Sequence, residues 1–191
     1  TRQRGGVAPN IAYSLSLLGE KPLIFATAGQ DFSDYRAWLD SHEINTWYIQ
    51  NIAEKFTASF FVNTDLDNNQ IASFYTGAMA DAANYSLKII EPGEADYVVI
   101  APNDPSAMQR YAEECVELGI PYLFDPSQQV ARKPHEDLKY GVSHAHAVFC
   151  NDYEFELLQK HTGFSASEIE KMVTLLVVTL GVKGAMVVSG G

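Results

Sequence analysis

The sequence predicts an α/β fold built on a mostly parallel β-sheet. Short apolar segments recur through the second half of the chain, and segments with the apolar spacing of helices lie between them. Strands of a parallel sheet are buried on both faces, so they read as continuous apolar runs, and the helices connect them. With 191 residues, 47% of them hydrophobic, the chain is long enough for one domain with a good core.

This repeating pattern runs from residue 97 to the end of the chain. Apolar strands are expected at 97–101, 121–124, 147–150, 175–178 and 185–188. Helices are expected at 106–118, 152–161 and from about residue 165, with a polar, partly helical stretch ending near Lys139. Gly119 is placed to end the first of these helices. The alternation predicts a sheet covered by helices on both faces.

The first half of the chain departs from the alternation at one place. A strand is expected at 23–27, a helix at 34–42 and a short strand at 46–50. Residues 57–63 and 70–75 are rich in β-branched and aromatic residues and flank a polar turn, which predicts a β-hairpin. Because a hairpin does not fit a parallel sheet, we expect it to stand off the core as a small lid.

The composition argues against several partners and compartments. A net charge of -11 without a basic cluster argues against nucleic acid and against an anionic membrane surface. No apolar run is long enough to span a bilayer, and the first residues do not have the character of a signal peptide. Cys115 and Cys150 are expected to be small buried thiols, which favours a reducing, cytoplasmic compartment.

The first candidate site is Gly5-Gly6, with the helix that follows it. Two glycines allow positive φ angles and leave the backbone open to a ligand. Pro9 suits the first position of a helix, which would put Asn10 in the first turn beside free backbone donors. Gly19 is placed to end this helix, whose core stripe is expected at Ile11, Leu15 and Leu18.

A small amide beside bare backbone, as at Asn10, is suited to gripping a polyhydroxylated ligand. The alternative is a tight loop–helix junction without a ligand. The two glycines alone favour that alternative, so the ligand hypothesis needs support from the rest of the chain.

Polar residues follow four of the predicted parallel strands. They are Asn103-Asp104, Asp125, Asn151 and Thr179. In open α/β sheets, ligands bind beyond the carboxyl ends of the strands, so these residues are expected to line one binding edge. Each residue alone has a simpler explanation as a helix cap or a turn. Their occurrence at consecutive strand ends favours a functional edge.

Asn151 and Glu154 are expected to open a helix one turn apart, on neighbouring parts of one face. An amide and a carboxylate so placed can hold water molecules around Mg²⁺, which keeps much of its hydration shell. The alternative is a capping box, in which each side chain bonds the backbone of the other residue. Both interpretations can hold together.

Thr179 begins the pattern T-x-G-x-x-G with Gly181 and Gly184. A hydroxyl followed by two glycines after a strand lets the backbone approach a flat or phosphorylated ligand. The spacing is not that of a P-loop, and an ordinary turn is the alternative. The five histidines have no companions at convincing zinc spacing.

Three motifs, in this order, resemble the ribokinase-like (PfkB) carbohydrate kinases. Gly5-Gly6-x-x-x-Asn10, with Gly19 and Gly29, resembles the first signature of the family. Asn151-x-x-Glu154 resembles its N-x-x-E motif, and the glycine pattern after Thr179 resembles its nucleotide-binding turn. The hairpin falls where the family has part of its substrate-covering lid. The resemblance implies a three-layer αβα sandwich, with residues 1–6 and 57–78 as a portion of the lid and 7–56 and 79–191 as an incomplete core.

The resemblance also implies an enzyme that transfers the γ-phosphoryl group of ATP to a primary hydroxyl, such as the 5′-OH of a nucleoside. The matching residues fall into three groups: Gly5, Gly6 and Asn10 for the sugar hydroxyls of the substrate; Asn151, Glu154 and Asp125 for Mg²⁺ and the phosphates; and Thr179, Gly181 and Gly184 for the nucleotide. ATP and Mg²⁺ are the implied cofactors, and a monovalent cation such as K⁺ is a further candidate. A homodimer through the lid is a candidate assembly.

Within the family, residues 64–71, 77–79 and 124–126 look most like bacterial nucleoside (adenosine) kinases. A sugar kinase of the ribokinase or fructokinase type and a non-catalytic protein that binds a nucleoside or sugar are the alternatives. The family's G-A-G-D motif with its catalytic Asp is not found, nor is the opening strand with its substrate-binding Asp. We therefore expect a fragment of a longer kinase, truncated at both ends, that does not catalyse phosphoryl transfer by itself.

Overall fold

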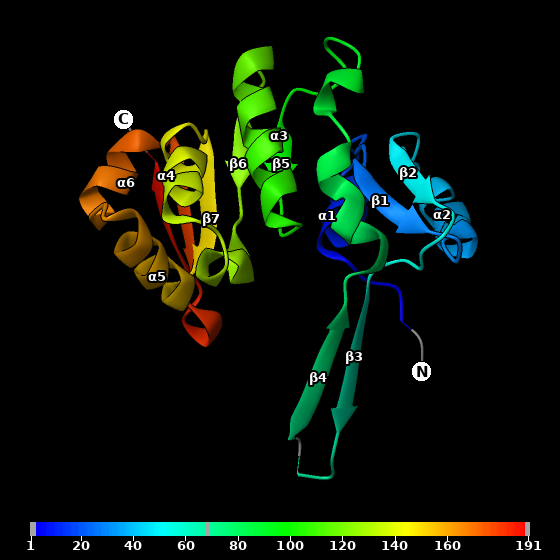
Figure 1. Ribbon diagram of the computed structural model, residues 1–191. Helices are drawn as coiled ribbons and strands as arrows, with labels where there is room; N and C mark the ends of the chain where they lie inside the picture. The colour runs from blue at the N-terminus through cyan, green and yellow to red at the C-terminus, as the bar shows by residue number, and fades with distance from the viewer. Residues whose placement is uncertain (1–2, 68, 190–191) are drawn as a thin grey trace. The chain divides into compact units, whose positions relative to one another are not determined.

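The chain divides into two compact units, Thr1–Asn84 and Tyr85–Gly191 (Figure 1). The structure is a computed structural model that describes residues 3–67 and 69–189. We call the two parts the N-terminal unit and the C-terminal unit. In the described part of the chain, no helix is both long enough and apolar enough to cross a lipid bilayer.

The N-terminal unit packs two helices against a small parallel sheet. Its elements are α1 (Val7–Leu17), β1 (Ala26–Gly29), α2 (Ser33–Asp40), β2 (Ile49–Ile52), β3 (Ser59–Thr64), β4 (Gln70–Tyr75) and the 3₁₀ segment η1 (Gly77–Asn84). Strand β1 pairs in parallel with β2. The core of this unit consists of buried apolar residues from both helices and the sheet: Ala12, Ile24, Ala28, Phe32, Leu39, Ile44 and Ile49.

Helix α1 begins two residues earlier than the sequence predicts. Pro9 is therefore the third helical residue and not the first, although it still lies among the residues whose N–H has no partner within the helix. Asn10 is the fourth helical residue, and its N–H makes the first hydrogen bond of the helix, to the carbonyl of Gly6 at 3.1 Å. Gly6 precedes the helix with φ at 103°, a conformation that favours glycine.

The predicted core stripe of α1 is only partly correct. Ala12 is the buried residue of the helix, Ile11 and Leu15 are half-buried, and Leu18 is 79% exposed. The small side chain of Ala12 lets the helix backbone approach the core closely, which a count of large apolar residues misses. Gly19 terminates the helix as predicted, just beyond Leu17 and the C-cap, through the hydrogen bonds of a Schellman motif to the last turn.

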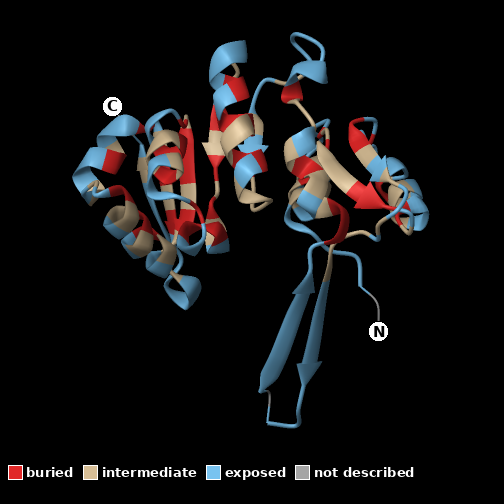
Figure 2. Cartoon of the chain, viewed as in Figure 1, coloured by how far each residue is buried: buried red, intermediate tan, exposed pale blue. Residues whose placement is uncertain are grey.

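The predicted hairpin is confirmed and projects from the body of the N-terminal unit (Figure 1). Strands β3 and β4 are antiparallel, with Phe60 opposite Phe74. Nearly every described residue of the two strands is exposed, so the pale-blue hairpin in Figure 2 contrasts with the buried body of the unit. The division of the whole chain into a lid and a core stays a prediction.

The root of the hairpin is fixed by close backbone packing. The N–H of Gly29 donates to Thr57 Oγ1 at 2.9 Å, and the N–H of Thr57 donates to Asp31 Oδ1 at 2.8 Å. A Cβ atom at Gly29 would overlap the backbone of residues 55–57. Only glycine therefore allows β1 to pass this close to the entry of the hairpin.

The C-terminal unit contains a five-stranded sheet in the order β5-β6-β7-β8-β9. The strands are β5 (Val98–Ile100), β6 (Tyr122–Phe124), β7 (Ala147–Asn151), β8 (Leu175–Thr179) and β9 (Ala185–Ser189). The first four are parallel, and β9 is antiparallel to β8. Only residues 180–184 join β8 to β9, which is too short for a parallel crossover. The mostly parallel sheet that the sequence predicts is confirmed.

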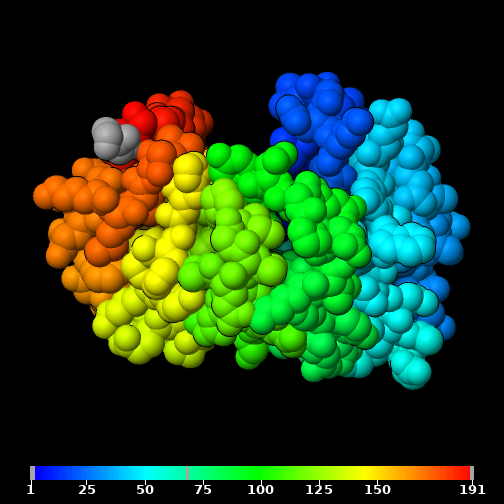
Figure 3. Space-filling model, turned by 90° about the horizontal axis from the view of Figure 1, so that it is seen from above, coloured from blue at the N-terminus to red at the C-terminus, as the bar shows by residue number. Residues whose placement is uncertain are grey.

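Helices follow the strands of the C-terminal unit as the alternation predicts. They are α3 (Pro105–Leu118), α4 (His135–Ser143), α5 (Asp152–Thr162) and α6 (Ala166–Met172), with short 3₁₀ segments η2 (Leu87–Ile89), η3 (Ser127–Ala131) and η4 (Gly181–Lys183). Gly119 ends α3 in the left-handed conformation. In the space-filling view, α3, α4 and then α5 and α6 follow one another across this unit in green, yellow and orange (Figure 3).

One buried row crosses the sheet of the C-terminal unit. Its members pair in register, and each is at most 2% exposed: Ile100, Phe124, Val148 and Leu176. Two of the alternate residues are less covered than the sequence predicts, since Val99 is 40% and Val187 is 63% exposed. Both belong to the outermost strands, where fewer neighbours cover the sheet.

Candidate functional site

The polar residues predicted at the strand ends of the C-terminal unit lie along one edge of its sheet. Strands β5 to β8 are parallel, so their carboxyl ends share that edge. Asp104 follows β5 and caps α3, Asp125 follows β6, and Asn151 and Thr179 end β7 and β8. Asn151 and Thr179 are register partners. The structure therefore brings this part of the predicted site together.

Asn151 and Glu154 form the capping box that the sequence left as an alternative. Asn151 Oδ1 accepts the N–H of Glu154 at 2.7 Å, and Glu154 Oε2 accepts the N–H of Asn151 at 2.9 Å. The Ser127 hydroxyl donates to Glu154 Oε1 at 3.3 Å. Both carboxylate oxygens of Glu154 are therefore held by neighbours, which fixes the direction of their remaining lone pairs.

The carboxyl of Asp125, at this edge, has a pKa well above its usual value. Burial raises the pKa of Asp125 to about 6, and the negative charge of Glu154 adds to this effect. A hydrogen bond from the Ser127 backbone opposes the increase. Two carboxyl groups that repel each other in a half-buried place form an environment that a cation would stabilise.

The donor set at this edge fits Mg²⁺ held through water. In residues 3–67 and 69–189, no three His, Cys, Asp or Glu side chains converge as a metal-ion cage. The amide of Asn151 and the two carboxyl groups of Asp125 and Glu154 supply oxygen atoms, the ligand type that Mg²⁺ prefers. Because Mg²⁺ usually keeps several of its water molecules, few direct protein ligands are required.

Ser127 lies between the two carboxyl groups in a strained conformation. Its φ of 42° lies in the left-handed region, which non-glycine residues seldom occupy. Such strain persists only where the surrounding structure imposes it, and it is concentrated at functional sites. Ser127 is not predictable from the sequence, because a single serine after a proline carries no signal of its backbone angle.

The glycine turn after Thr179 is open. The N–H of Leu180 donates to the carbonyl of Gly184 at 2.7 Å, which closes the turn. Gly181 and Gly184 have φ angles of 58° and 92°, and no atom lies within 4 Å of a Cβ built on either. The glycines are required by backbone conformation, and the turn surface has room for a ligand.

Cys150 precedes Asn151 but is not a nucleophile. Burial raises the pKa of the Cys150 thiol to about 12, and the charges of Glu154 and Asp125 add to this effect. The thiol therefore stays protonated at neutral pH, and only the thiolate is nucleophilic.

The remaining predicted site residues lie in the N-terminal unit. Gly5, Gly6 and Asn10 are all exposed where the chain enters α1. The carbonyl of Gly5 accepts a hydrogen bond from the Tyr35 hydroxyl at 3.1 Å, a contact that no sequence pattern predicts. These residues belong to a different unit from Asn151 and Thr179, so a cleft common to the two groups stays a prediction.

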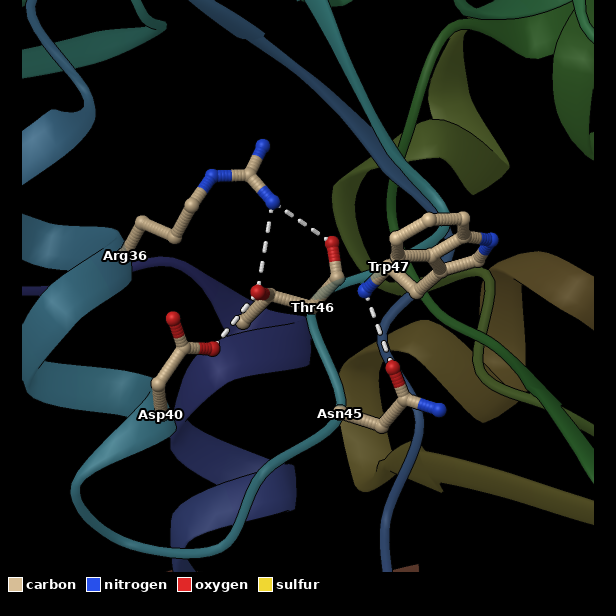
Figure 4. Close-up of a pocket in the computed structure, with 5 residues that line it drawn as sticks. All are labelled: Arg36, Asp40, Asn45, Thr46 and Trp47. Atoms are coloured by element: carbon tan, nitrogen blue, oxygen red, sulfur yellow. Dashed lines mark hydrogen bonds between the residues drawn. The ribbon is translucent and has the colours of Figure 1, made fainter.

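A hollow of about 560 Å³ in the N-terminal unit is lined by none of the predicted site residues. It is lined by Arg36, Asp40, Asn45, Thr46 and Trp47 (Figure 4). The Arg36 guanidinium donates to the carbonyls of Thr46 and Ile49 at 2.7 and 3.0 Å. Asn45–Trp47 precede β2, so the hollow is near the amino end of that strand. Arg36 and Asp40 of α2 both bond to Thr46, and they thereby attach the loop that precedes β2 to this helix.

The whole chain, residues 1–191, matches the family described as pfkB family carbohydrate kinase. The chain belongs to the pfkB family. This assignment confirms the resemblance that three separate motifs carried in the sequence.

Two curated relatives of this pfkB chain are nucleoside kinases. The nucleoside kinase of Methanocaldococcus jannaschii is 30% identical over 186 residues, which cover 96% of this chain and 60% of that protein. The nucleoside kinase of Methanothermobacter thermautotrophicus is 31% identical over 192 residues, covering 97% and 61%. The chain spans about three fifths of the length of these relatives.

Solved structures confirm the fold class of the pfkB chain. Burkholderia thailandensis nucleoside kinase in complex with inosine has a TM-score of 0.92 at 32% identity, over 99% of this chain and 63% of that one. The M. jannaschii nucleoside kinase, an archaeal member of the ribokinase family, has a TM-score of 0.87 at 27% identity, over 97% and 61%. The chain therefore has the ribokinase-like α/β fold.

Proposed function

We propose that this pfkB chain belongs to a kinase that transfers the γ-phosphoryl group of ATP to the 5′-hydroxyl of a nucleoside such as adenosine. The observation that carries the proposal is the polar edge of the C-terminal unit, where Asp125, Asn151, Glu154 and Thr179 follow three neighbouring strands. The B. thailandensis kinase, which is similar to this chain, has been solved with inosine and with ADP-inosine. These bound molecules favour a nucleoside over a free sugar.

The edge residues of the C-terminal unit are proposed to serve the phosphates. Asn151, Glu154 and Asp125 would hold hydrated Mg²⁺, which neutralises phosphate charge when bound. Asp125 is partly protonated near its pKa of about 6, and a cation beside it would favour its charged form. Thr179, Gly181 and Gly184 would border the nucleotide, because the two glycines of the open turn leave their backbone uncovered.

Gly5, Gly6 and Asn10 are proposed to hold the ribose of the nucleoside. Asn10 is exposed and carries both a donor and an acceptor, which suits a pair of neighbouring hydroxyls. A Cβ atom at Gly5 would meet nothing within 4 Å, so a ligand has room to approach the backbone there. In phosphoryl transfer, such positioning of the acceptor hydroxyl supplies much of the catalysis.

The test compares ligands in one assay. The protein, expressed from its complete reading frame, is incubated with ATP labelled in the γ-phosphate and with adenosine, inosine, ribose or fructose. The proposal predicts label on the nucleosides and little on the free sugars. Label only on the sugars would identify a sugar kinase, and nucleoside binding without any transfer would identify a binding protein.

We also propose that the chain forms a homodimer, in which the hairpin of one copy covers the apolar side chains on the hairpin of the other. Phe60 is 66% and Ile71 is 79% exposed, and the two lie on opposite faces of the hairpin by their register. An isolated two-stranded hairpin with apolar side chains on both faces is only marginally stable in water. A partner hairpin would bury these side chains.

A K⁺ requirement stays a prediction. A cytoplasmic location is proposed from the two buried free cysteines.

A further inference from the structure

The loop that carries Gly5 is attached to helix α2 by two successive residues. The Tyr35 hydroxyl donates to the carbonyl of Gly5 at 3.1 Å, across 30 residues of sequence. The guanidinium of Arg4 lies over the ring of Trp38, 5.3 Å from its centroid. Tyr35 and Trp38 are three positions apart on α2, so they lie on one face of the helix.

Tyr35 and Trp38 are themselves held in place by neighbouring aromatic rings. The ring of Tyr35 packs against Phe32 and Trp38, with centroids 5.5 and 5.9 Å apart. Phe32 is buried in the core of the unit, and Trp38 packs against Tyr13 of α1 at 5.1 Å. Rings that contact several neighbours have few alternative rotamers, so the Tyr35 hydroxyl has a defined position.

The Tyr35 hydrogen bond determines which way the peptide between Gly5 and Gly6 faces. In a trans peptide, the carbonyl and the N–H point in opposite directions. The carbonyl of Gly5 faces Tyr35, so the N–H of Gly6 faces away from α2. Glycine allows this peptide to rotate more easily than other residues do, so an external restraint is needed to fix it.

The next peptide is restrained from the other side. The carbonyl of Gly6 accepts the N–H of Asn10 at 3.1 Å. Tyr35 and α1 thus fix two consecutive peptides of the loop, one through each glycine carbonyl. The same loop and Asn10 are the residues proposed to hold the ribose.

We propose that Tyr35 is a positioning residue that sets the orientation of the Gly5–Gly6 peptide for nucleoside binding. The ligand part of this inference rests on the proposed function, whereas the positioning of the loop does not. Burial raises the pKa of Tyr35, and the charge of Arg4 only partly offsets this effect, so the hydroxyl stays a donor at neutral pH.

Limited proteolysis tests the loop without any ligand. Trypsin cleaves after arginine, and Arg4 is adjacent to the anchored carbonyl of Gly5. Tyr35→Phe removes one hydroxyl and keeps the ring. We expect the initial rate of cleavage at Arg4–Gly5, followed by mass spectrometry, to rise roughly 3- to 10-fold, as loss of one hydrogen bond allows. Tyr13→Phe, in the same aromatic cluster but on α1, should leave the rate unchanged.

Nucleoside binding tests the second half of the inference. The dissociation constant of adenosine, measured by calorimetry, should rise roughly 3- to 10-fold in Tyr35→Phe and stay constant in Tyr13→Phe. The affinity for ADP should not change in either variant. A cleavage rate equal to that of the unmodified chain would overturn the positioning role, and faster cleavage with unchanged adenosine affinity would overturn its link to the ligand. If Gly5→Ala also leaves adenosine affinity unchanged, the proposed ribose site itself is wrong.

Discussion

Asn151 and Glu154 each bond the backbone of the other, so one pair of side chains both caps α5 and ends at the carboxyl edge of the sheet. The structural and the ligand-binding interpretations of the N-x-x-E motif therefore use the same atoms. Replacing either residue by alanine would disturb the helix and the site together. Variants that keep the cap are needed to separate the two roles.

Asn151→Ser separates them. Serine is a good helix cap, so we expect the free energy of unfolding to stay within about 0.5 kcal/mol of the unmodified chain, whereas Asn151→Ala should lose about 1 kcal/mol. If the amide holds water around Mg²⁺, both variants should bind Mg²⁺·ADP more weakly by about tenfold. Urea unfolding and calorimetry measure the two effects. Normal Mg²⁺·ADP affinity in Asn151→Ser would leave capping as the sole role.

The raised pKa of Asp125 predicts a pH-dependent penalty on stability. Because the pKa of about 6 in the folded protein is above the unfolded value of about 4, the folded state binds more protons between these pH values. The neutral Asp125 carboxyl makes its full contribution to the free energy of unfolding below about pH 4, and this contribution is lost as pH rises through about 6. Asp125→Asn should therefore stabilise the protein at pH 7.5, by on the order of 1–3 kcal/mol.

The measurement is urea unfolding of both proteins at pH 4 and at pH 7.5. The advantage of Asp125→Asn should shrink toward zero at the lower pH. Added Mg²⁺ at pH 7.5 should also narrow the gap, since it stabilises the charged carboxyl only in the unmodified chain. An advantage of equal size at both pH values would show that the carboxyl of Asp125 is not perturbed.

Gly29 and Gly5 should respond in opposite ways to the same added methyl group. Gly29→Ala places a Cβ atom against the backbone at the root of the hairpin, so we expect a loss of about 3 kcal/mol or more in stability. Gly5→Ala meets no atom within 4 Å and should be stable to within about 0.5 kcal/mol, yet bind adenosine more weakly. Thermal unfolding and calorimetry test both. A stable Gly29→Ala variant would contradict the packing described here.

The hairpin surface predicts a concentration-dependent dimer. Phe60→Glu places a charge opposite Phe74, on a face that a partner copy would bury. Light scattering should give a monomer for this variant and a dimer for the unmodified chain. Lys21→Gln, outside the hairpin, changes the net charge by the same one unit and is the control for the change in charge. Monomers throughout would assign the apolar hairpin to another role.

The elements with strong local signals were predicted well from sequence. The β3–β4 hairpin, the glycine that ends α3 and the capping box of α5 all follow from side chains a few residues away. The start of α1 was misplaced, because proline is also tolerated in the third helical position. Leu18 was wrongly expected in the core, because periodicity does not tell which face of a helix meets its neighbours.

The candidate site was only partly predictable for a similar reason. Strand ends place Asp125, Asn151 and Thr179 on one edge by topology alone, which a sequence pattern can reveal. The contact between Tyr35 and Gly5 and the strained φ of Ser127 depend on chain segments that meet only after folding. Neither leaves a periodic or compositional signal.

The most direct test of the account is a crystal structure of the protein with inosine, ADP and Mg²⁺. We predict that the ribose lies against Gly6 and Asn10, and that the ADP phosphates lie at the edge formed by Asn151 and Thr179. Inosine bound in the hollow beside Trp47, or phosphates bound away from Asn151, would contradict the account.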